Sequence, residues 1–410
     1  MADDPRSGAV ATGRGFFALL AAGMLFAAAA GDGLALERGG ETMQERIGET
    51  AQGRGGPQQA PRDEPIGPGV REIPGRVLGD VPLTEADETV KALVERLDFD
   101  SYKELIRGLA EFGDREQGTE RNERANEWIE AQLQSWGYET ERLHYTFREE
   151  PRWLVYATKV GATVPEEMVI LGGHMDGRGG GDAVNDNASG TALVLEIARV
   201  LASPDVETER SVRFALWNNE ETGLNGARAY VEQRLELQGI EDPPGSGRFP
   251  EPRWIAKIQH DKVMYDRGNP PGLHQAWNAD VDVEYDLDSE KSEESAQLGI
   301  LLINANRMFA TDYPAALSNA MSSTDSVPFA DHVAAVSVRE NRRRYEIGWS
   351  GPRGYGARGS DPNWHQPTDI FVTYSDWDFL LGFNATQTTF GATAKLVGAR
   401  LVAPGDDGAR

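Results

Sequence analysis

The chain has 410 residues, of which 39% are hydrophobic, so it can bury the core of one large domain or of two ordinary ones. Its formal net charge of -25 argues against nucleic acid or an anionic membrane surface as a partner. It contains no cysteine, which excludes disulfides, thiolate zinc sites, cysteine nucleophiles and lipid anchors attached through cysteine.

The first 80 residues differ in composition from the rest of the chain. Residues 16–30 form an apolar run, which is shorter than the about 20 residues that a membrane-spanning helix needs. We therefore expect residues 1–30 to be a signal peptide, with an uncleaved N-terminal anchor as the alternative. Residues 31–80 are rich in Gly, Pro, Gln, Glu and Arg, which predicts a disordered linker. These features indicate a secreted or periplasmic (cell-envelope) protein, with membrane contact only through residues 16–30.

From residue 81 onward, periodic apolar patterns predict one globular domain over 81–402, followed by a flexible tail over 403–410. The predicted helices cover residues 84–97, 101–113, 122–137, 188–203, 223–235, 294–310 and 375–398. The predicted strands cover residues 152–160, 167–173, 211–217, 253–259 and 332–338. After residue 150 strands and helices alternate, and the strands are continuously apolar. This pattern is typical of an α/β domain with a mostly parallel, mixed central sheet that is flanked by helices.

Four of the predicted strands lead into residues that can bind metals. These residues are His174 and Asp176, then Glu220 and Glu221, then His260 and Asp261, and finally His365 after a longer loop. A further carboxylate, Asp186, lies between Asp176 and Glu220, in the glycine-rich stretch DGRGGGDAVNDNASG. Ligands of open α/β sheets gather outside the carboxyl ends of the strands. Oxygen and imidazole donors without sulfur suit a hydrolytic zinc site.

The ordered motifs HMDG, NDNASG, NNEETGLNGARAY, HDKV and DPNWHQPTD resemble those of the di-zinc exopeptidases of metallopeptidase family 28. That family includes secreted bacterial aminopeptidases, plasma and glutamate carboxypeptidases, and glutaminyl cyclases. The resemblance implies the zinc-exopeptidase (phosphorylase/hydrolase-like) fold, two zinc ions per chain and peptide substrates. It also implies that Asp186 bridges the two zinc ions. The remaining ligands would be His174 and Asp261 at one ion, and Glu221 and His365 at the other.

The resemblance further implies catalytic roles for two carboxylates. Glu220 would be the general base for a hydroxide held by the two zinc ions. Asp176 would hold the imidazole of His174 in one tautomer. A cis peptide bond between Asp186 and Asn187 is also implied.

Two ligand positions have rivals in the sequence. His260 competes with Asp261, although neighbouring residues on a strand face opposite ways. His332 competes with His365, and the motif NWHQPTD favours His365. The family often has Ser-Asp-His where this chain has Thr324-Asp325-Ser326. The resemblance therefore does not establish which contacts these three residues make.

We expect a zinc-dependent exopeptidase, and an aminopeptidase in particular, because a carboxylate-rich site can also hold a substrate ammonium. A carboxypeptidase or dipeptidase is the first alternative, with the Arg-rich segment 339–358 holding a substrate carboxylate. Further alternatives are a glutaminyl cyclase and a binding module without catalysis.

Overall fold

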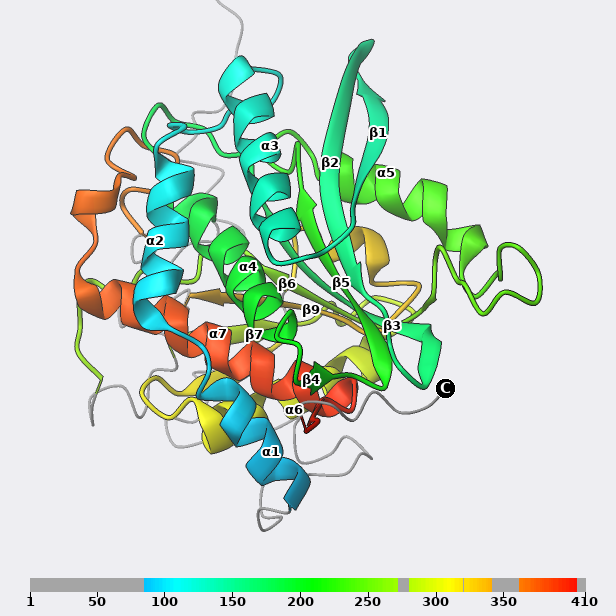
Figure 1. The fold of residues 1–410 in the computed structure, drawn as a ribbon. Coiled ribbons are helices and arrows are strands. Elements are labelled where there is room, and N and C mark those ends of the chain that lie inside the picture. The colour runs from blue at the N-terminus through cyan, green and yellow to red at the C-terminus, as the bar shows by residue number, and fades with distance from the viewer. Residues whose placement is uncertain (1–84, 272–279, 320, 341–360, 404–410) are drawn as a thin grey trace, which may run out of the picture. The chain divides into compact units, whose positions relative to one another are not determined.

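A computed structural model of the chain describes residues 85–271, 280–319, 321–340 and 361–403 (Figure 1). The predicted leader over 1–30, the predicted linker over 31–80 and most of the predicted tail lie outside the described residues. Within the described ranges, no helix combines the length and the apolar character needed to cross a bilayer.

An eight-stranded sheet lies at the centre of the described part, in the order β1-β2-β5-β3-β6-β9-β7-β8 (Figure 1). Its strands are β1 (Thr140–Phe147), β2 (Glu150–Lys159), β3 (Val164–His174), β5 (Arg210–Trp217), β6 (Arg253–His260), β7 (Val281–Glu284), β8 (Ala315–Ser318) and β9 (Ala335–Glu340). The four central strands β5, β3, β6 and β9 are parallel, whereas β2 and β7 run antiparallel beside them. The prediction of a mixed, mostly parallel sheet is confirmed.

Seven α-helices surround this sheet in the described residues (Figure 1). They are α1 (Glu85–Val94), α2 (Phe99–Ala110), α3 (Glu120–Ser135), α4 (Ser189–Leu201), α5 (Asn225–Arg234), α6 (Ser292–Phe309) and α7 (Asp376–Leu396). A second, two-stranded sheet pairs β4 (Val206–Glu207) with β10 (Arg400–Leu401). All predicted helices are found, with ends that differ by a few residues.

Two hydrophobic cores cover the opposite faces of the sheet. Along β3, Val169 and Leu171 belong to one core, and Met168 and Ile170 belong to the other. This alternation follows from the pleat of a strand, where successive side chains point to opposite faces. The larger core contains residues of α4, α6 and α7, and the smaller one contains Tyr230 of α5. Because β3 is buried on both faces, only side chains at its carboxyl end can contact a ligand.

The strand predicted over 332–338 begins later in the structure, at Ala335. His332 instead lies in a turn, where its backbone N–H donates to the carbonyl of Phe329 at 2.8 Å. Apolar residues in that turn extend the pattern of the strand and caused the early boundary.

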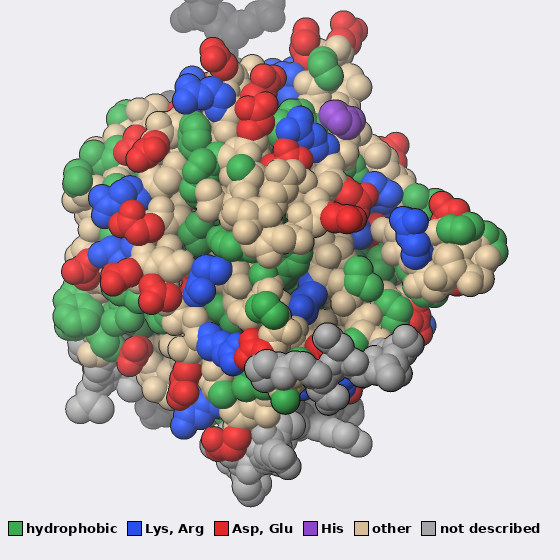
Figure 2. All heavy atoms as spheres, viewed as in Figure 1, with side chains coloured by type: hydrophobic (Ala, Val, Ile, Leu, Met, Phe, Trp, Pro, Cys, Tyr) green, Lys and Arg blue, Asp and Glu red, His purple; other side chains and the backbone are tan. Residues whose placement is uncertain are grey.

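The acidic excess of the sequence is not gathered in one area of the face shown in Figure 2. On that face Asp and Glu side chains are interspersed with Lys and Arg side chains over the described residues. The described residues on this face therefore form no single-sign patch that would steer a charged ligand.

Candidate metal centre

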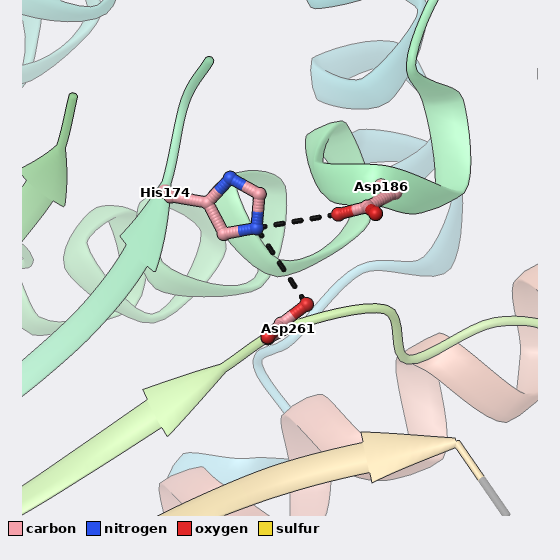
Figure 3. A group of neighbouring side chains, drawn as sticks. All are labelled: His174, Asp186 and Asp261. Carbon is pink, nitrogen blue, oxygen red and sulfur yellow. Dashed lines mark ion pairs between the residues drawn. The ribbon is translucent and has the colours of Figure 1, made fainter. Parts of the chain in front are cut away.

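The first candidate group lies at the carboxyl end of β3, where His174 faces two carboxylates (Figure 3). Its Nε2 atom lies 3.3 Å from Asp186 Oδ1 and 3.5 Å from Asp261 Oδ1. Asp261 directly follows β6, and Asp186 lies on a π-helical turn before α4. The three side chains are buried, and their donor atoms are close enough together to hold one metal ion.

The second candidate group shares Asp186 and adds Glu221 and His365. His365 Nε2 lies 3.1 Å from Asp186 Oδ2 and 2.9 Å from Glu221 Oε2. Glu221 comes shortly after β5, whereas His365 lies in the loop before α7 and has a left-handed backbone φ of 54°. The structure therefore brings together all five side chains that the sequence singled out as ligands.

Asp186 joins the two groups, because each of its carboxylate oxygens faces a different histidine. Its Oδ1 atom is buried and has no hydrogen-bond partner in the described part of the chain. A buried carboxylate oxygen is costly unless a positive charge compensates it, and here either a protonated His174 imidazole, 3.3 Å away, or a bound metal cation can do so. The two imidazoles and three carboxylates, with no sulfur among them, fit zinc.

Asp369 holds the turn that carries Asp186. Its carboxylate accepts hydrogen bonds from the backbone N–H groups of Asn185 at 2.9 Å and Asp186 at 3.1 Å. The peptide bond between Asp186 and Asn187 is cis, which confirms the implication of the resemblance. The direction of the Asp186 side chain is thus fixed by buried hydrogen bonds to its own backbone.

Arg115 holds the glycine-rich loop between His174 and Asp186. Its guanidinium is fully buried and donates to backbone carbonyls on that loop. The acceptors are Met175 at 2.8 Å, Asp182 at 2.7 Å and Ala183 at 2.8 Å. A planar guanidinium with five donors suits such a role. The sequence analysis missed Arg115, since no motif surrounds it.

Asp176 contacts His174 through its backbone, whereas its carboxylate binds the backbone of the Glu220-Glu221 pair. Its backbone carbonyl, not its carboxylate, lies 3.0 Å from His174 Nδ1. The carboxylate is 3.8 Å from that nitrogen and accepts instead from the backbone N–H groups of Glu220 at 3.1 Å and Glu221 at 3.3 Å. Two backbone donors within hydrogen-bond distance attract the carboxylate more strongly than one imidazole farther away. Asp176 therefore positions the Glu220-Glu221 pair.

Glu220 lines the same cavity as both candidate groups, and no described residue donates a hydrogen bond to its carboxylate. Burial raises the pKa of Glu220 well above its ordinary value, although His174 opposes the shift. An unpaired carboxylate with a raised pKa in a cleft is a candidate for proton transfer.

The two histidines show how negative the site is. Burial lowers the pKa of His365, but Asp186 and Glu221 raise it to about 9. Burial likewise lowers the pKa of His174, yet the carboxylates around it, with Glu220 foremost, raise it well above the ordinary value. Burial, with the charge of Asp186, raises the pKa of Glu221 to about 7. The carboxylates thus attract positive charge, whether a proton or a metal cation.

The rival histidines lie away from the two groups. His260 is buried and interacts with the Gly172 carbonyl at 2.9 Å and with Thr389 Oγ1 at 3.0 Å. His332 is exposed in its turn. The arginines predicted to hold a substrate carboxylate, Arg342, Arg343, Arg344, Arg353 and Arg358, lie outside the described residues.

Two arginines touch the predicted ligands, and sequence reasoning did not identify either contact. The guanidinium of the buried Arg339 donates to Asp261 Oδ2 and to the Ser323 carbonyl. The guanidinium of the half-exposed Arg178 lies 2.9 Å from His365 Nδ1 and 3.2 Å from Glu221 Oε2. These contacts depend on tertiary structure, so no local sequence pattern predicts them.

Comparison with known proteins places the chain in a family. Residues 154–390 match the family described as Peptidase family M28. The probable lipoprotein aminopeptidase LpqL of Mycobacterium tuberculosis is 45% identical over 91 residues, which are 22% of this chain and 17% of that protein. A probable leucine aminopeptidase 2 of Aspergillus oryzae is 28% identical over 227 residues, 54% of this chain and 41% of that protein. The chain thus spans less than half the length of either relative.

The crystal structure of the Legionella pneumophila LapA aminopeptidase has a similar fold. The TM-score is 0.58, the sequence identity is 17%, and the similarity covers 78% of this chain and 77% of that one. At this identity the likeness concerns the fold alone. The family match covers more than half of the chain. The chain therefore belongs to peptidase family M28, a family of metallopeptidases and hence of hydrolases.

Proposed function

We propose that this protein is a zinc-dependent aminopeptidase that binds two zinc ions. The observation that carries the proposal is the shared position of Asp186, whose two oxygens lie 3.3 and 3.1 Å from different histidines. Each histidine has a further carboxylate beside it, Asp261 or Glu221. A carboxylate that serves two such groups is suited to bridge two cations.

In this proposal His174, Asp186 and Asp261 hold one zinc ion, and Asp186, Glu221 and His365 hold the other. When bound, the zinc ions would polarise the scissile carbonyl and lower the pKa of a water molecule. Arg339 would fix the orientation of Asp261 through the carboxylate oxygen that faces away from His174.

Glu220 would be the general base. Its unpaired carboxylate faces the cavity and can accept the proton of the attacking water, then give it to the leaving amine nitrogen. Asp176 would keep Glu220 and Glu221 in place through their backbone N–H groups. Neighbouring residues can thus act differently, one as a base and the other as a ligand.

We infer an aminopeptidase rather than a carboxypeptidase because the relatives reported above carry that name. The substrates would be peptides.

Hydrolysis of matched peptides tests the proposal. The purified chain should cleave Leu-Ala-amide, lose activity with a chelator, and regain it with zinc. N-acetyl-Leu-Ala-amide should not be cleaved. Cleavage of the acetylated peptide, or zinc-independent activity, would contradict the proposal. Mass spectrometry of an N-terminal glutaminyl peptide separates water addition from the loss of ammonia that a cyclase would cause.

Secretion through residues 1–30 belongs to the same proposal. One relative is named a lipoprotein aminopeptidase, although this chain has no cysteine for a lipid anchor. The intact mass of the protein from its native host should correspond to a chain without residues 1–30. A mass that includes them would reject cleavage.

A further inference from the structure

We propose that Lys262, held against Trp364, recognises a carboxylate of the substrate next to the bond that is cleaved. The inference rests on the proposed peptidase function, because it assumes that the cleaved bond lies at the candidate metal centre. It assigns a substrate class, peptides with a carboxylate near that bond.

The cavity at the candidate metal centre has a volume of about 470 Å³, which is the size of a small-ligand site. Its charged lining is balanced. The acidic residues are Asp186, Glu220, Glu221 and Asp261, and the basic residues are Arg178, Arg228, Lys262 and Arg339. Two divalent cations would therefore make the cavity net positive. Such a cavity favours an anionic group on the ligand over a second cationic one.

The three arginines have other partners in the cavity wall. Arg339 is buried against Asp261. Arg178 is half exposed and lies 3.2 Å from Glu221 Oε2. Arg228 is exposed and donates to a nearby backbone carbonyl at 3.1 Å. Among these basic side chains, Lys262 alone has no ion pair or hydrogen bond of its ammonium with a described residue.

The position of Lys262 is fixed at its backbone. It has a left-handed φ of 55°, which non-glycine residues rarely adopt. Its N–H donates to Asn187 Oδ1 at 3.2 Å, and its carbonyl accepts from the Glu340 N–H at 2.7 Å. The side chain therefore leaves the chain in a direction set by buried neighbours, directly after Asp261.

The ammonium of Lys262 is held at its other end by an aromatic ring. It lies 4.2 Å from the ring centroid of Trp364, at a distance typical of a cation–π contact. The Trp364 ring in turn packs on the His365 imidazole, with 4.4 Å between centroids. Lys262 thus stands between Asp261 of one candidate group and His365 of the other. A substrate whose scissile carbonyl lies at these groups would bring its neighbouring substituents to this ammonium.

Asp261 is already paired with Arg339, and Lys262 contacts the face of a neutral ring instead. An ammonium held in this way keeps its donors available for a carboxylate, which is its strongest partner. The carboxylate can come from an acidic N-terminal side chain or from the free C-terminus of a dipeptide.

Matched substrates test the inference and identify the source. The ratio of kcat/KM is measured for glutamyl- and glutaminyl-p-nitroanilide, and for Leu-Ala and Leu-Ala-amide. We expect the carboxylate member of one pair to be preferred by about tenfold or more. A preference in the first pair identifies the side chain, and one in the second pair identifies the C-terminus.

Variants connect the preference to the residue. In Lys262→Met the preference should fall to about twofold or less, and Lys262→Arg should retain most of it. The matched control is Lys291→Met, since Lys291 pairs with Glu294 at 3.2 Å at the start of α6 and does not line the cavity. The control should keep the wild-type ratio. A wild-type enzyme without any preference, or a preference unchanged in Lys262→Met, overturns the inference.

A binding measurement separates this inference from the proposed function. Calorimetric titration of the zinc-loaded protein with glutamate, glutamine, Leu-Ala and Leu-Ala-amide, on a Glu220→Gln background, needs no turnover. Binding that prefers the carboxylate ligand and depends on Lys262, in a wild-type protein that cleaves no peptide, supports carboxylate recognition by Lys262 and rejects the peptidase. Hydrolysis without any carboxylate preference in rate or binding retains the peptidase and rejects the inference.

Discussion

Two buried histidines end neighbouring strands of the sheet and have opposite surroundings. His174 at the end of β3 faces Asp186 and Asp261, and the carboxylates around it raise its pKa well above the ordinary value. His260 at the end of β6 meets a carbonyl and a hydroxyl, and burial lowers its pKa to about 3. A buried imidazole at a strand end is therefore a candidate ligand only where its neighbours supply uncompensated negative charge.

The same contrast separates His260 from Asp261, which follows it in the chain. The imidazole of His260 points toward Thr389 of α7, whereas Asp261 Oδ1 points toward His174. Because successive side chains of a strand point to opposite faces, His260 makes a structural contact whereas Asp261 points into the candidate site.

The largest expected effect is that of His174→Gln. Removing this imidazole should abolish zinc binding at its group and lower kcat/KM by about 1000-fold or more, which is ~4 kcal/mol in transition-state stabilisation. Zinc content and peptide hydrolysis measure the effect. If His174→Gln kept full zinc and wild-type activity, the contrast with His260 would be wrong.

Glu220→Gln should have the next largest effect. The amide keeps the size of the side chain but cannot accept a proton, so turnover should fall by about 100- to 10,000-fold. Zinc content should remain that of the wild type, because Glu220 belongs to neither candidate group. Near wild-type turnover in this variant would reject Glu220 as the base.

The affinity for zinc should depend on pH, because a proton and a cation compete for the same imidazole. The pKa of His365 is raised to about 9, so this residue is largely protonated at pH 7 in the zinc-free protein. Affinity should therefore rise as pH increases from 7 to 9, by about tenfold per pH unit for each proton displaced, and then level off. Competition with a chelator of known pH dependence measures this.

The raised pKa of His365 also determines how the stability of the zinc-free protein changes with pH. Protonated His365 stabilises the zinc-free protein through its ion pairs. This contribution is complete at pH values below about 6.5, the pKa of histidine in the unfolded chain, and it is lost as the pH rises through about 9. Stabilisation by zinc should thus be greater at pH 9 than at pH 7. An affinity that stays constant or decreases over this range would show that these imidazoles do not hold the metal.

The smallest effect is expected for His260→Gln, the counterpart of the first variant. It disturbs two buried polar contacts, which should cost about 1–3 kcal/mol in the free energy of unfolding. Zinc content should be unchanged. Denaturant unfolding and metal analysis test both statements, and a loss of zinc would place His260 in the site.

Much of the fold could be predicted because the central strands are apolar on both faces. The pattern over 167–173 and 211–217 lies inside β3 and β5, which pair in parallel. The edge strand β1 was not predicted, since most residues of TERLHYTF are exposed or half-buried and show no apolar run. The strands β7 and β8 are only four residues long, too short for a periodic signal.

The candidate ligands could be predicted because each stands in a local motif at the end of a strand or in a marked loop. Their supporting contacts could not. Arg339 and Asp261 are 78 positions apart and meet only through the pairing of β9 with β6. Asp176 was expected to orient His174 with its carboxylate, and the fold instead places two backbone donors nearer to that group.

The most direct test is a crystal structure of the zinc-loaded protein with anomalous data at the zinc edge. We expect two peaks that share Asp186, one within bonding distance of His174 and Asp261, the other within bonding distance of Glu221 and His365. A single peak that Asp186 does not ligate, or zinc bound only elsewhere in the chain, would contradict the account.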